Sequence, residues 1–387
     1  MREGSGQVEQ VRRQNTALVL RALRSDGPLT RTEIARRIGL AKATVGSIVG
    51  DLETAGLAAE TGELTGGRGR PGRAVALTGE TVVGLGLEVN VDYVATVTLD
   101  VSGAIQHAES VSVAGRSPLD VLAEVASRRV RGIRQEGGRL AGVTAAVPGL
   151  VGIDRRIVRW APNLNWHDLD LGVALERATG VPDVTVDNDA NCAAIGESGH
   201  GAVTGIDDAL YLTGTIGIGA GWIVGGRLVR GHGGLAGEVG HLPLGAPDSL
   251  CGCGRQGCWE ASIGLRAALA AAGVAEVGTP WDSAEAVADA ARRDPQVASA
   301  VARIGDRLGH GIAVLAGFAD PEAVVLGGYF VPLAEWLLPA AEKSLRDHLS
   351  FSDLHRPVLR LSPLGLQAAA LGAAESALDR VLTGSIP

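Results

Sequence analysis

Aromatic side chains are scarce in this sequence of 387 residues, where Phe, Tyr and Trp together make up 3%. Glycine is abundant instead, with 56 residues, and 16 prolines accompany it. The core must therefore be built from small aliphatic side chains, with turns made at glycines, as in α/β proteins that carry phosphate-type loops. Hydrophobic residues still make up 46% of the chain, which excludes a mostly disordered protein and leaves room for two or three domains.

Long apolar runs are absent as well. Glycines or charged residues interrupt every apolar run well short of the roughly 18 residues that a membrane-spanning helix needs. The first residues include Glu3 and Glu9 and have no apolar core, so a signal peptide is not expected. We therefore expect a cytoplasmic protein with no membrane partner.

Positive charge is in the minority, because the formal net charge is −8, and this argues against a protein coated uniformly by nucleic acid. The charges are unevenly distributed. Residues 1–79 hold 12 Lys and Arg against 8 Asp and Glu, whereas the remainder holds 23 against 35. A basic region on an acidic body predicts that the first region alone approaches a polyanion, with a chance asymmetry as the alternative.

The basic region has the pattern of three helices followed by a β-wing. The apolar positions that mark the first helix are Val8, Val11, Leu18, Ala22 and Leu23. Thr30 and Glu33 form a capping-box pattern that starts a second helix, and Gly39 provides the turn after it. A third helix is expected from about residue 41 to 55, with Val45, Ile48, Val49 and Leu52 on its buried face. This pattern predicts a helix-turn-helix, and a small protein-interaction module is the alternative.

The third helix presents short polar side chains and one lysine near its start, which suits a helix lying deep in a major groove. The DNA contacts expected from the helices are Arg31, Lys42, Ala43, Thr44 and Ser47. Ala41 stands where such a helix usually carries a capping Ser or Thr, a loss worth about 1 kcal/mol.

The wing is expected between two short strands at residues 57–59 and 75–77. Its three arginines, Arg68, Arg70 and Arg73, lie on a slim Gly/Pro backbone that suits a narrow minor groove. The segment resembles the Arg-Gly-Arg-Pro hook of minor-groove binders. A basic Gly-rich loop alone would more often be a linker, but its place after a helix-turn-helix favours double-stranded DNA as the partner.

From Thr81 onward the pattern changes to alternating strands and helices. Strand-like runs occur at residues 82–87, 93–99, 142–147, 184–186 and 210–213, and helical stretches at 119–135 and 189–199. Such alternation predicts an α/β sheet with helices on both faces.

Three of the four cysteines lie close together, in the segment Cys251-Gly-Cys253-Gly-Arg-Gln-Gly-Cys258, and His241 precedes them. Three thiolates and an imidazole predict a closed tetrahedral Zn²⁺ site, structural in type, with one ion per chain. A disulfide is the rival interpretation, but a cytoplasmic chain keeps its thiols reduced. The fourth cysteine, Cys192, is expected to be a packed free thiol.

Two carboxylates flank this segment: Glu238, on the face of His241 if the stretch is helical, and Glu260, just after Cys258. If zinc takes one ring nitrogen of His241, the other is held in a fixed orientation, so the set suits a ligand with hydroxyl groups. Buried salt bridges are the alternative role for both carboxylates.

A second polar run, Asp187-Asn188-Asp189-Ala190-Asn191, follows an expected strand and opens a helix. Open α/β sheets bind ligands at this position, and Asp189 could serve as a general base on a hydroxyl group. Helix capping by Asp187 or Asn188 explains the same run equally well.

Together these segments resemble the ROK family of repressors, open reading frames and sugar kinases. The matching segments are Val147-Pro148-Gly149, Ala161-Pro162-Asn163, Asn188-Asp189-Ala190-Asn191, Gly237-Glu238-Val239-Gly240-His241, the cysteine segment as far as Glu260, and Val325-Leu326-Gly327-Gly328. The zinc signature is specific, whereas the Gly-rich pieces are individually weak. The resemblance spans about residues 81–382 and, with the basic region, nearly the whole chain.

The resemblance implies an actin-like (ribonuclease H-like) fold of two α/β subdomains with a sugar in the cleft between them. A winged helix-turn-helix at 1–79 would precede a ligand domain at 80–387, whose subdomains would cover about 80–190 plus the C-terminal helix and about 191–365. The implied sugar-binding residues are Asn163, Asn188, Asp189, Glu238, His241 and Glu260. The implied zinc ligands are His241, Cys251, Cys253 and Cys258.

The chain departs from the family's kinases where ATP would bind. Those kinases open the domain with an Asp-x-Gly-Gly-Thr turn, and the matching stretch here, Glu88-Val89-Asn90-Val91-Asp92, lacks both glycines. The second phosphate loop, Thr215-Ile216-Gly217-Ile218-Gly219-Ala220-Gly221, is half kept. Because phosphoryl transfer depends on positioning those phosphates, we predict no kinase activity and regard Asp189 as a vestigial base.

The sequence therefore predicts a sugar-responsive transcriptional regulator, a repressor of carbohydrate-metabolism genes. Its partners would be operator DNA, a sugar or sugar-phosphate effector, and further copies of itself in a dimer or tetramer. One alternative is a ROK sugar kinase that kept weak activity and gained a DNA-binding head. Another is a constitutive DNA-binding protein whose body serves only for dimerisation.

Overall fold

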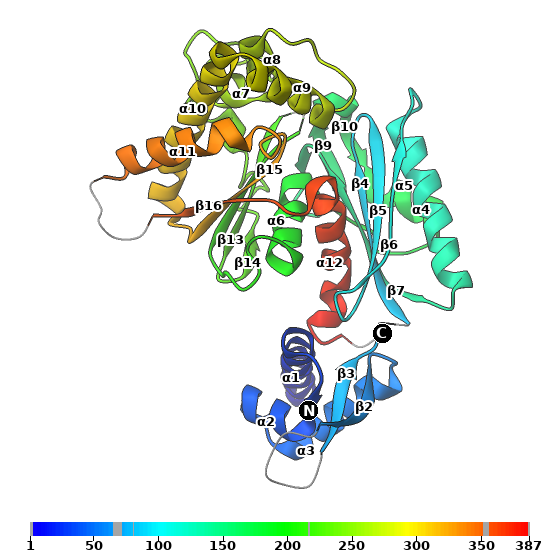
Figure 1. The fold of residues 1–387 in the computed structure, drawn as a ribbon. Helices are drawn as coiled ribbons and strands as arrows, with labels where there is room; N and C mark the ends of the chain where they lie inside the picture. Colours follow the sequence, from blue (N-terminus) through cyan, green and yellow to red (C-terminus); the bar gives the residue numbers. More distant parts are fainter. Residues whose placement is uncertain (1–2, 65–71, 80, 216, 351–355, 386–387) are drawn as a thin grey trace.

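The computed structural model describes the chain apart from residues 1–2, 65–71, 80, 216, 351–355 and 386–387. A small head lies at one end of the molecule, and two α/β lobes stand side by side above it (Figure 1). Two helices, α6 (Asp189–His200) and α12 (Ala368–Leu382), run between the sheets of the two lobes.

The head is a winged helix-turn-helix, as predicted. Its helices are α1 (Glu3–Asp26), α2 (Arg31–Ile38) and α3 (Lys42–Thr54), and its strands are β1 (Leu29–Thr30), β2 (Ala58–Leu64) and β3 (Gly72–Leu77), in the order β1-β3-β2. The capping box at the start of α2 is present, because Thr30 and Glu33 each accept a hydrogen bond from the other's backbone amide. Gly39 ends α2 in the left-handed conformation, with φ of 69°. Ala41 caps α3 without a side-chain hydrogen bond.

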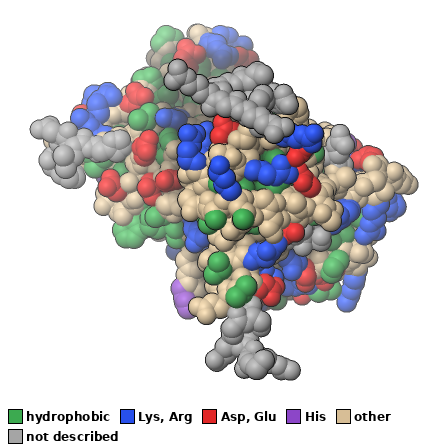
Figure 2. Space-filling view, turned by 90° about the horizontal axis from the view of Figure 1, so that it is seen from below, with side chains coloured by type: hydrophobic (Ala, Val, Ile, Leu, Met, Phe, Trp, Pro, Cys, Tyr) green, Lys and Arg blue, Asp and Glu red, His purple; other side chains and the backbone are tan. Residues whose placement is uncertain are grey.

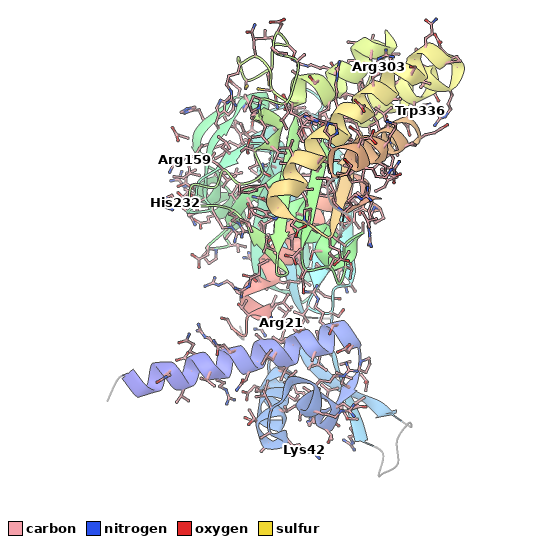
Figure 3. The ribbon with its side chains drawn as sticks, turned by 90° about the vertical axis from the view of Figure 1, so that its left-hand side faces the viewer. Arg21, Lys42, Arg159, His232, Arg303 and Trp336 are labelled. Atoms are coloured by element: carbon pink, nitrogen blue, oxygen red, sulfur yellow. The ribbon has the colours of Figure 1, made fainter. Side chains whose placement is uncertain are left out.

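The first helix is confirmed, but its apolar face was only partly interpreted correctly. Ala22 and Leu23 are buried, whereas Val8 and Val11 are 71% and 50% exposed, and Leu18 is also exposed. The amino-terminal half of α1 extends beyond the rest of the head (Figure 3), and no other element of the described part of the chain buries Val8 or Val11. Helical spacing therefore predicted the helix and not its packing.

The first lobe is built on a five-stranded sheet in the order β11-β7-β4-β5-β6. Its strands are β4 (Val82–Val89), β5 (Tyr93–Asp100), β6 (Ile105–Ser112), β7 (Arg139–Val147) and β11 (Thr185–Asn188). The helices α4 (Pro118–Gln135) and α5 (Leu171–Thr179) pack on it, beside a small sheet of β8 (Leu150–Val151), β9 (Ile157–Ala161) and β10 (Trp166–Asp170). All eight residues of β4 are buried because the strand is central, whereas β6 alternates between exposed and half-buried residues at the edge.

The second lobe carries a sheet in the order β14-β13-β12-β15-β16. Its strands are β12 (Ala209–Gly214), β13 (Ile218–Val224), β14 (Arg227–Val229), β15 (Ala323–Gly328) and β16 (Val358–Leu361). The helices that belong to it are α7 (Glu260–Ile263), α8 (Leu265–Ala272), α9 (Pro280–Arg293), α10 (Pro295–Ala319) and α11 (Ala334–His348). Short 3-10 turns at η1 (Pro162–Leu164), η2 (Val239–His241) and η3 (Gly365–Gln367) complete the body.

Small residues let the two central helices approach each other and the sheet closely. A Cβ added at Gly372 of α12 would lie 1.7 Å from the carbonyl oxygen of Cys192 on α6, and one at Gly86 of β4 would lie 2.0 Å from that of Ala370. A single hydrophobic core joins α12 to β5 and to the head. The scarcity of aromatic residues thus corresponds to backbone contacts that larger side chains would prevent. In the described part of the chain, no helix is long and apolar enough to cross a bilayer.

Candidate ligand pocket, metal centre and nucleic-acid interface

A cavity of about 240 Å³ lies between the two lobes. The structure brings all six sequence-predicted sugar residues into its lining: Asn163, Asn188, Asp189, Glu238, His241 and Glu260. Segments around Pro148 and Gly217 also line it, together with other residues that include Trp160, Cys251, Cys253 and Arg266. Three carboxylates, two carboxamides and an imidazole around one small cavity form a set that can hydrogen-bond several hydroxyl groups.

The end of β11 and the start of α6 position two of these side chains. Asn188 caps α6, because its Oδ1 accepts a hydrogen bond from the Asn191 amide at 3.1 Å, while its Nδ2 donates to the carbonyl oxygen of Gly149. Capping and cavity lining therefore coexist in the same residue. Burial raises the pKa of Asp189 to about 7, against the hydrogen bond from the Ala190 amide, and the negative charge of Glu238 contributes to the increase.

The other two carboxylates lie on the second lobe. Glu260 begins α7. Its Oε2 accepts a hydrogen bond from the Ile218 amide at 2.9 Å, which ties the carboxylate to the start of β13. Glu238 precedes η2, a single 3-10 turn instead of the longer helix considered from the sequence. Burial raises the pKa of Glu238. Neither carboxylate has an ion pair with Arg or Lys among the described residues, so the salt-bridge alternative has no partner in that part of the chain.

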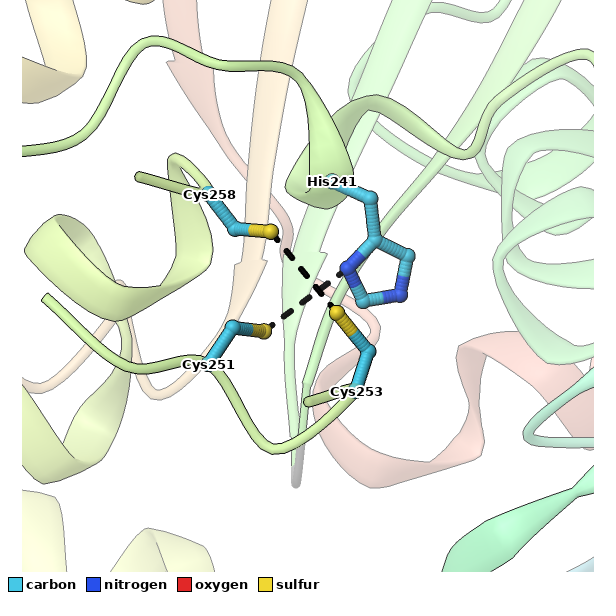
Figure 4. Close-up of side chains that lie close together, drawn as sticks. All are labelled: His241, Cys251, Cys253 and Cys258. Carbon is cyan, nitrogen blue, oxygen red and sulfur yellow. Dashed lines mark hydrogen bonds between the residues drawn. The ribbon is translucent and has the colours of Figure 1, made fainter. Parts of the chain in front are cut away.

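The predicted metal ligands also come together (Figure 4). One ligand atom from each of His241, Cys251, Cys253 and Cys258 lies within 4.8 Å of all the others. The Nδ1 of His241 is 3.8 Å from Cys251 Sγ, and the sulfur atoms of Cys253 and Cys258 are 3.7 Å apart. A Zn–S bond of about 2.3 Å places tetrahedral ligand atoms about 3.8 Å apart, so the donor set is compatible with a structural zinc ion. Cys192 is a buried free thiol on α6.

The stretch of residues 88–92, which is predicted to match the kinases' first phosphate turn, contains no glycine and is followed by Tyr93. Glu88 is buried, and the hydroxyl group of Tyr93 donates a hydrogen bond to its Oε1 at 2.5 Å. Burial raises the pKa of Glu88 to about 8, against the hydrogen bond from Tyr93. The cavity that these residues share with Asp189 and Thr213 measures only about 30 Å³. The sequence analysis did not single out Tyr93, although tyrosine is rare in this chain, which has only three.

The expected DNA-contacting residues of α3 lie on the outer side of the head. Lys42, Ala43 and Ser47 are exposed, Thr44 is half-buried, and Lys42 lies at the end of the molecule away from the lobes (Figure 3). Seen from below in Figure 2, the molecule carries Lys and Arg side chains with Asp and Glu among them. Sequence reasoning also missed Arg12 of α1, whose Nη2 donates to Ser47 Oγ at 3.3 Å and pairs with Asp51.

Two other predicted contacts are engaged with acidic side chains. Arg31 pairs with Glu53 at 3.0 Å and with Glu60 at 2.7 Å, and Arg73 also pairs with Glu60 at 2.7 Å. The remaining wing arginines, Arg68 and Arg70, lie outside the described residues. In the described part of the candidate interface, the outer side of α3 is therefore exposed to solvent, and Arg31 and Arg73 both pair with Glu60.

The profile of the ROK family matches residues 84–380. The chain belongs to the ROK family. Its ROK domain is preceded by a match to the MarR family at residues 12–69, which covers the helix-turn-helix.

Relatives of this ROK protein include both regulators and kinases. The xylose repressor of Bacillus subtilis is 28% identical over 376 residues, which cover 96% of this chain and 97% of the repressor. The glucokinase of Streptomyces coelicolor is 34% identical over 318 residues, which cover 76% of this chain and 98% of the kinase. The crystal structure of a ROK family transcriptional regulator described as a homologue of the Escherichia coli MLC protein superposes with a TM-score of 0.80 at 24% identity, covering 97% of this chain and 98% of that one. The two-lobed fold with a winged head is therefore confirmed.

Proposed function

We propose that this ROK protein is a sugar-responsive DNA-binding transcriptional repressor of carbohydrate-metabolism genes. The observation that carries the proposal is the combination, in one chain, of a winged helix-turn-helix and a cavity lined by six polar groups suited to hydroxyl ligands. The similarity to a xylose repressor along 96% of the chain supports it, because the head is included in that match.

The pocket residues have distinct roles in this proposal. Asp189, Glu238 and Glu260 accept hydrogen bonds from sugar hydroxyl groups, and Asn163 and Asn188 can donate and accept. A zinc ion held by His241, Cys251, Cys253 and Cys258 supplies a rigid structural anchor. Since Nδ1 of His241 faces the cysteine sulfurs, its Nε2 is left for the ligand (Figure 4).

The region around Glu88, where a kinase of this family would bind phosphates, favours a regulator over a kinase. Asn90 and Val91 stand where the family's kinases carry glycines, and the neighbouring cavity, lined by Glu88 and Tyr93, measures only about 30 Å³. The glucokinase relatives and the retained Asp189 keep a sugar kinase with an added head as the second candidate. A protein that binds DNA constitutively is less well supported, because it has no use for the six polar groups.

A route from the pocket to the head runs through α6. Asp189 is its first residue and His200 its last, and Nε2 of His200 lies 3.3 Å from Oε2 of Glu375 on α12. The same carboxylate accepts two hydrogen bonds from Arg24 of α1, at 2.5 and 2.7 Å. Although burial opposes the effect, His200 and Arg24 lower the pKa of Glu375 to about 2. A sugar that shifts α6 would therefore act on the ion pair that holds the head.

The functional unit in this proposal is a cytoplasmic homo-oligomer, a dimer or a tetramer, bound to double-stranded operator DNA. Two heads would contact half-sites about one helical turn apart, through α3 and a wing that includes Arg68, Arg70 and Arg73. Domain limits at 1–79 and 80–387 belong to the same proposal.

The deciding experiment titrates operator DNA binding by the full chain against a panel of sugars and sugar phosphates. The proposal expects one member of the panel to change operator affinity by tenfold or more. It also expects no ADP release above background with ATP and the same sugars. Robust ADP release would favour the kinase, and operator binding that no sugar alters would favour the constitutive protein.

A further inference from the structure

We propose that a second cavity, next to the sugar pocket, binds a phosphate group. This cavity measures about 220 Å³, close to the size of the first. It lies between the loop after β8, the end of β11 and the loop after β14, and three of its lining residues are basic: Arg155, Arg230 and His232. The existence of a phosphate site depends only on these residues. The link between that phosphate and a sugar effector rests on the proposed function.

Two guanidinium groups from distant segments converge on the carboxylate of Asp187, whose side chain is 5% exposed. Its Oδ2 accepts hydrogen bonds from Nε and Nη2 of Arg230 at 2.9 and 2.7 Å and lies 3.2 Å from Nη2 of Arg155. Its Oδ1 accepts from the Asn188 amide and from Asn191 Nδ2. The hydrogen-bonding capacity of Asp187 is therefore used up within the protein.

The charges in this cavity do not balance. Arg155 and Arg230 carry two positive charges against one negative charge on Asp187, and their side chains are only 28% and 34% exposed. The contact of Arg155 Nη2 with Asp187 lacks hydrogen-bond geometry, and the buried Nε of Arg155 has no hydrogen-bond partner among the described residues. Excess positive charge that is partly shielded from water attracts an anion, and guanidinium groups bind phosphate oxygens with particular strength.

The backbone holds Arg155 in an unfavourable conformation. Its φ of 53° lies in the left-handed region, which residues with a side chain rarely adopt. The Arg155 carbonyl oxygen accepts a hydrogen bond from the Val186 amide at 2.8 Å, which ties the loop to β11. On the opposite wall, Gly234 has φ of 77°, and a Cβ there would lie 2.8 Å from the carbonyl oxygen of Val151. The close approach of the two loops therefore requires Gly234, and the strained backbone of Arg155 keeps this residue in the lining of the cavity.

Consecutive residues connect this cavity to the sugar pocket. Asp187 organises the two arginines, Asn188 lines both cavities, and Asp189 lines the sugar pocket. The phosphate has two possible sources that share the same chemistry: a free ion that binds beside the sugar, or a phosphate ester on the sugar itself. An ester would make the affinity for the sugar phosphate, and not that for the parent sugar, depend on the arginine pair, whereas a free ion would occupy the site together with the sugar.

The test measures binding of inorganic phosphate to the full chain by calorimetry in a chloride buffer. We expect one phosphate per chain, with at least tenfold weaker binding in Arg155→Gln. This variant should keep its fold, because Arg230 still pairs with Asp187, and a melting temperature near that of the wild type checks it. Arg159→Gln is the matched control, since Arg159 lies on the same side of the molecule as His232 (Figure 3), pairs with Asp154 and Asp168, and does not line the cavity.

Equal phosphate binding by wild type and Arg155→Gln, or none by the wild type, would overturn the proposal. Two further titrations identify the source. A sugar phosphate that displaces inorganic phosphate, and that Arg155→Gln weakens while the parent sugar is unaffected, identifies the ester. Sugar and phosphate bound together identify the free ion. If phosphate binding depends on Arg155 but no sugar or ester binds, the anion site stands and the proposed sugar response fails.

Discussion

Asp189 lines two cavities of very different size: about 240 Å³ toward the predicted sugar residues and about 30 Å³ toward Glu88 and Tyr93. The larger cavity is lined by the six polar side chains and by apolar ones such as Trp160 and Leu265. The smaller one is lined by a carboxyl group and a phenol that are hydrogen-bonded to each other.

The two sides place opposite demands on the sequence. A sugar is recognised by polar side chains, so a sugar site is retained only where Asn, Asp, Glu and His are retained. Phosphates are bound largely by main-chain amides, so in the proposed function the side chains of this turn would prevent phosphate binding. Replacing a few glycines can therefore remove phosphoryl transfer while the ligand pocket remains.

The largest effect is expected at the proposed metal centre, three of whose ligands line the predicted sugar cavity. Cys253→Ser should remove stoichiometric zinc and sugar binding together, because His241 loses the ion that orients it. Metal analysis and calorimetry measure the two losses. Cys192→Ser is the control, since that buried thiol lies on α6 outside the cluster and its loss should leave the zinc content unchanged. Wild-type protein without zinc, or a zinc-free variant with full sugar affinity, would contradict the prediction.

The next effect concerns the residue that the two cavities share. Asp189→Asn should weaken sugar binding by about 1.5–3 kcal/mol, because a hydroxyl group loses a charged acceptor. Neither form should release ADP above background. Glu88→Gln is the matched control on the closed side, and we expect its sugar affinity to stay within about twofold of wild type. Turnover that is present in wild type and absent in Asp189→Asn would reverse the assignment.

The affinity for sugar should depend on pH through the ionisation of Asp189. The pKa of Asp189 is raised to about 7, so below that pH the free protein carries a proton there that must leave before the carboxylate can accept from a hydroxyl group. Affinity should therefore rise with pH, by up to about tenfold per unit below pH 7, and level off above it. Asp189→Asn should flatten the profile measured by calorimetry between pH 6 and 8. An unchanged slope would assign the dependence to another group.

The last prediction concerns the stability of the chain, not its ligand affinity, and is made at Glu88. Burial raises its pKa from the ordinary value of 4.5 to about 8, so the folded state retains the proton and Glu88 lowers the stability of the fold as pH rises from 4.5 through 8. Glu88→Gln, which resembles the protonated acid, should match wild type near pH 4.5 and be more stable at pH 9. Urea unfolding at the two pH values measures the difference, and equal stability at pH 9 would show that Glu88 ionises without cost.

Local patterns predicted much of this molecule. The capping box of Thr30 and Glu33, the cysteine spacing and the six pocket residues are short-range signals, and the structure places the pocket residues around one cavity. Pairings between distant residues left no such signal. Arg24 and Glu375 are 351 positions apart, and Arg155 and Arg230 meet only through the fold. The exposure of Val8 and Val11 was not predictable either, because helical spacing does not state what covers a face.

Helix α6 has a thermodynamic consequence for any effector, because its first residue lines the sugar cavity and its last contacts the carboxylate that holds Arg24. If the two ends are coupled, the coupling is reciprocal: the factor by which sugar weakens operator binding equals the factor by which operator DNA weakens sugar binding. Sugar affinity measured on the free protein would then overestimate the affinity of the operator-bound form. The concentration of sugar needed to vacate an operator would be set by that bound form and would rise with the strength of the operator.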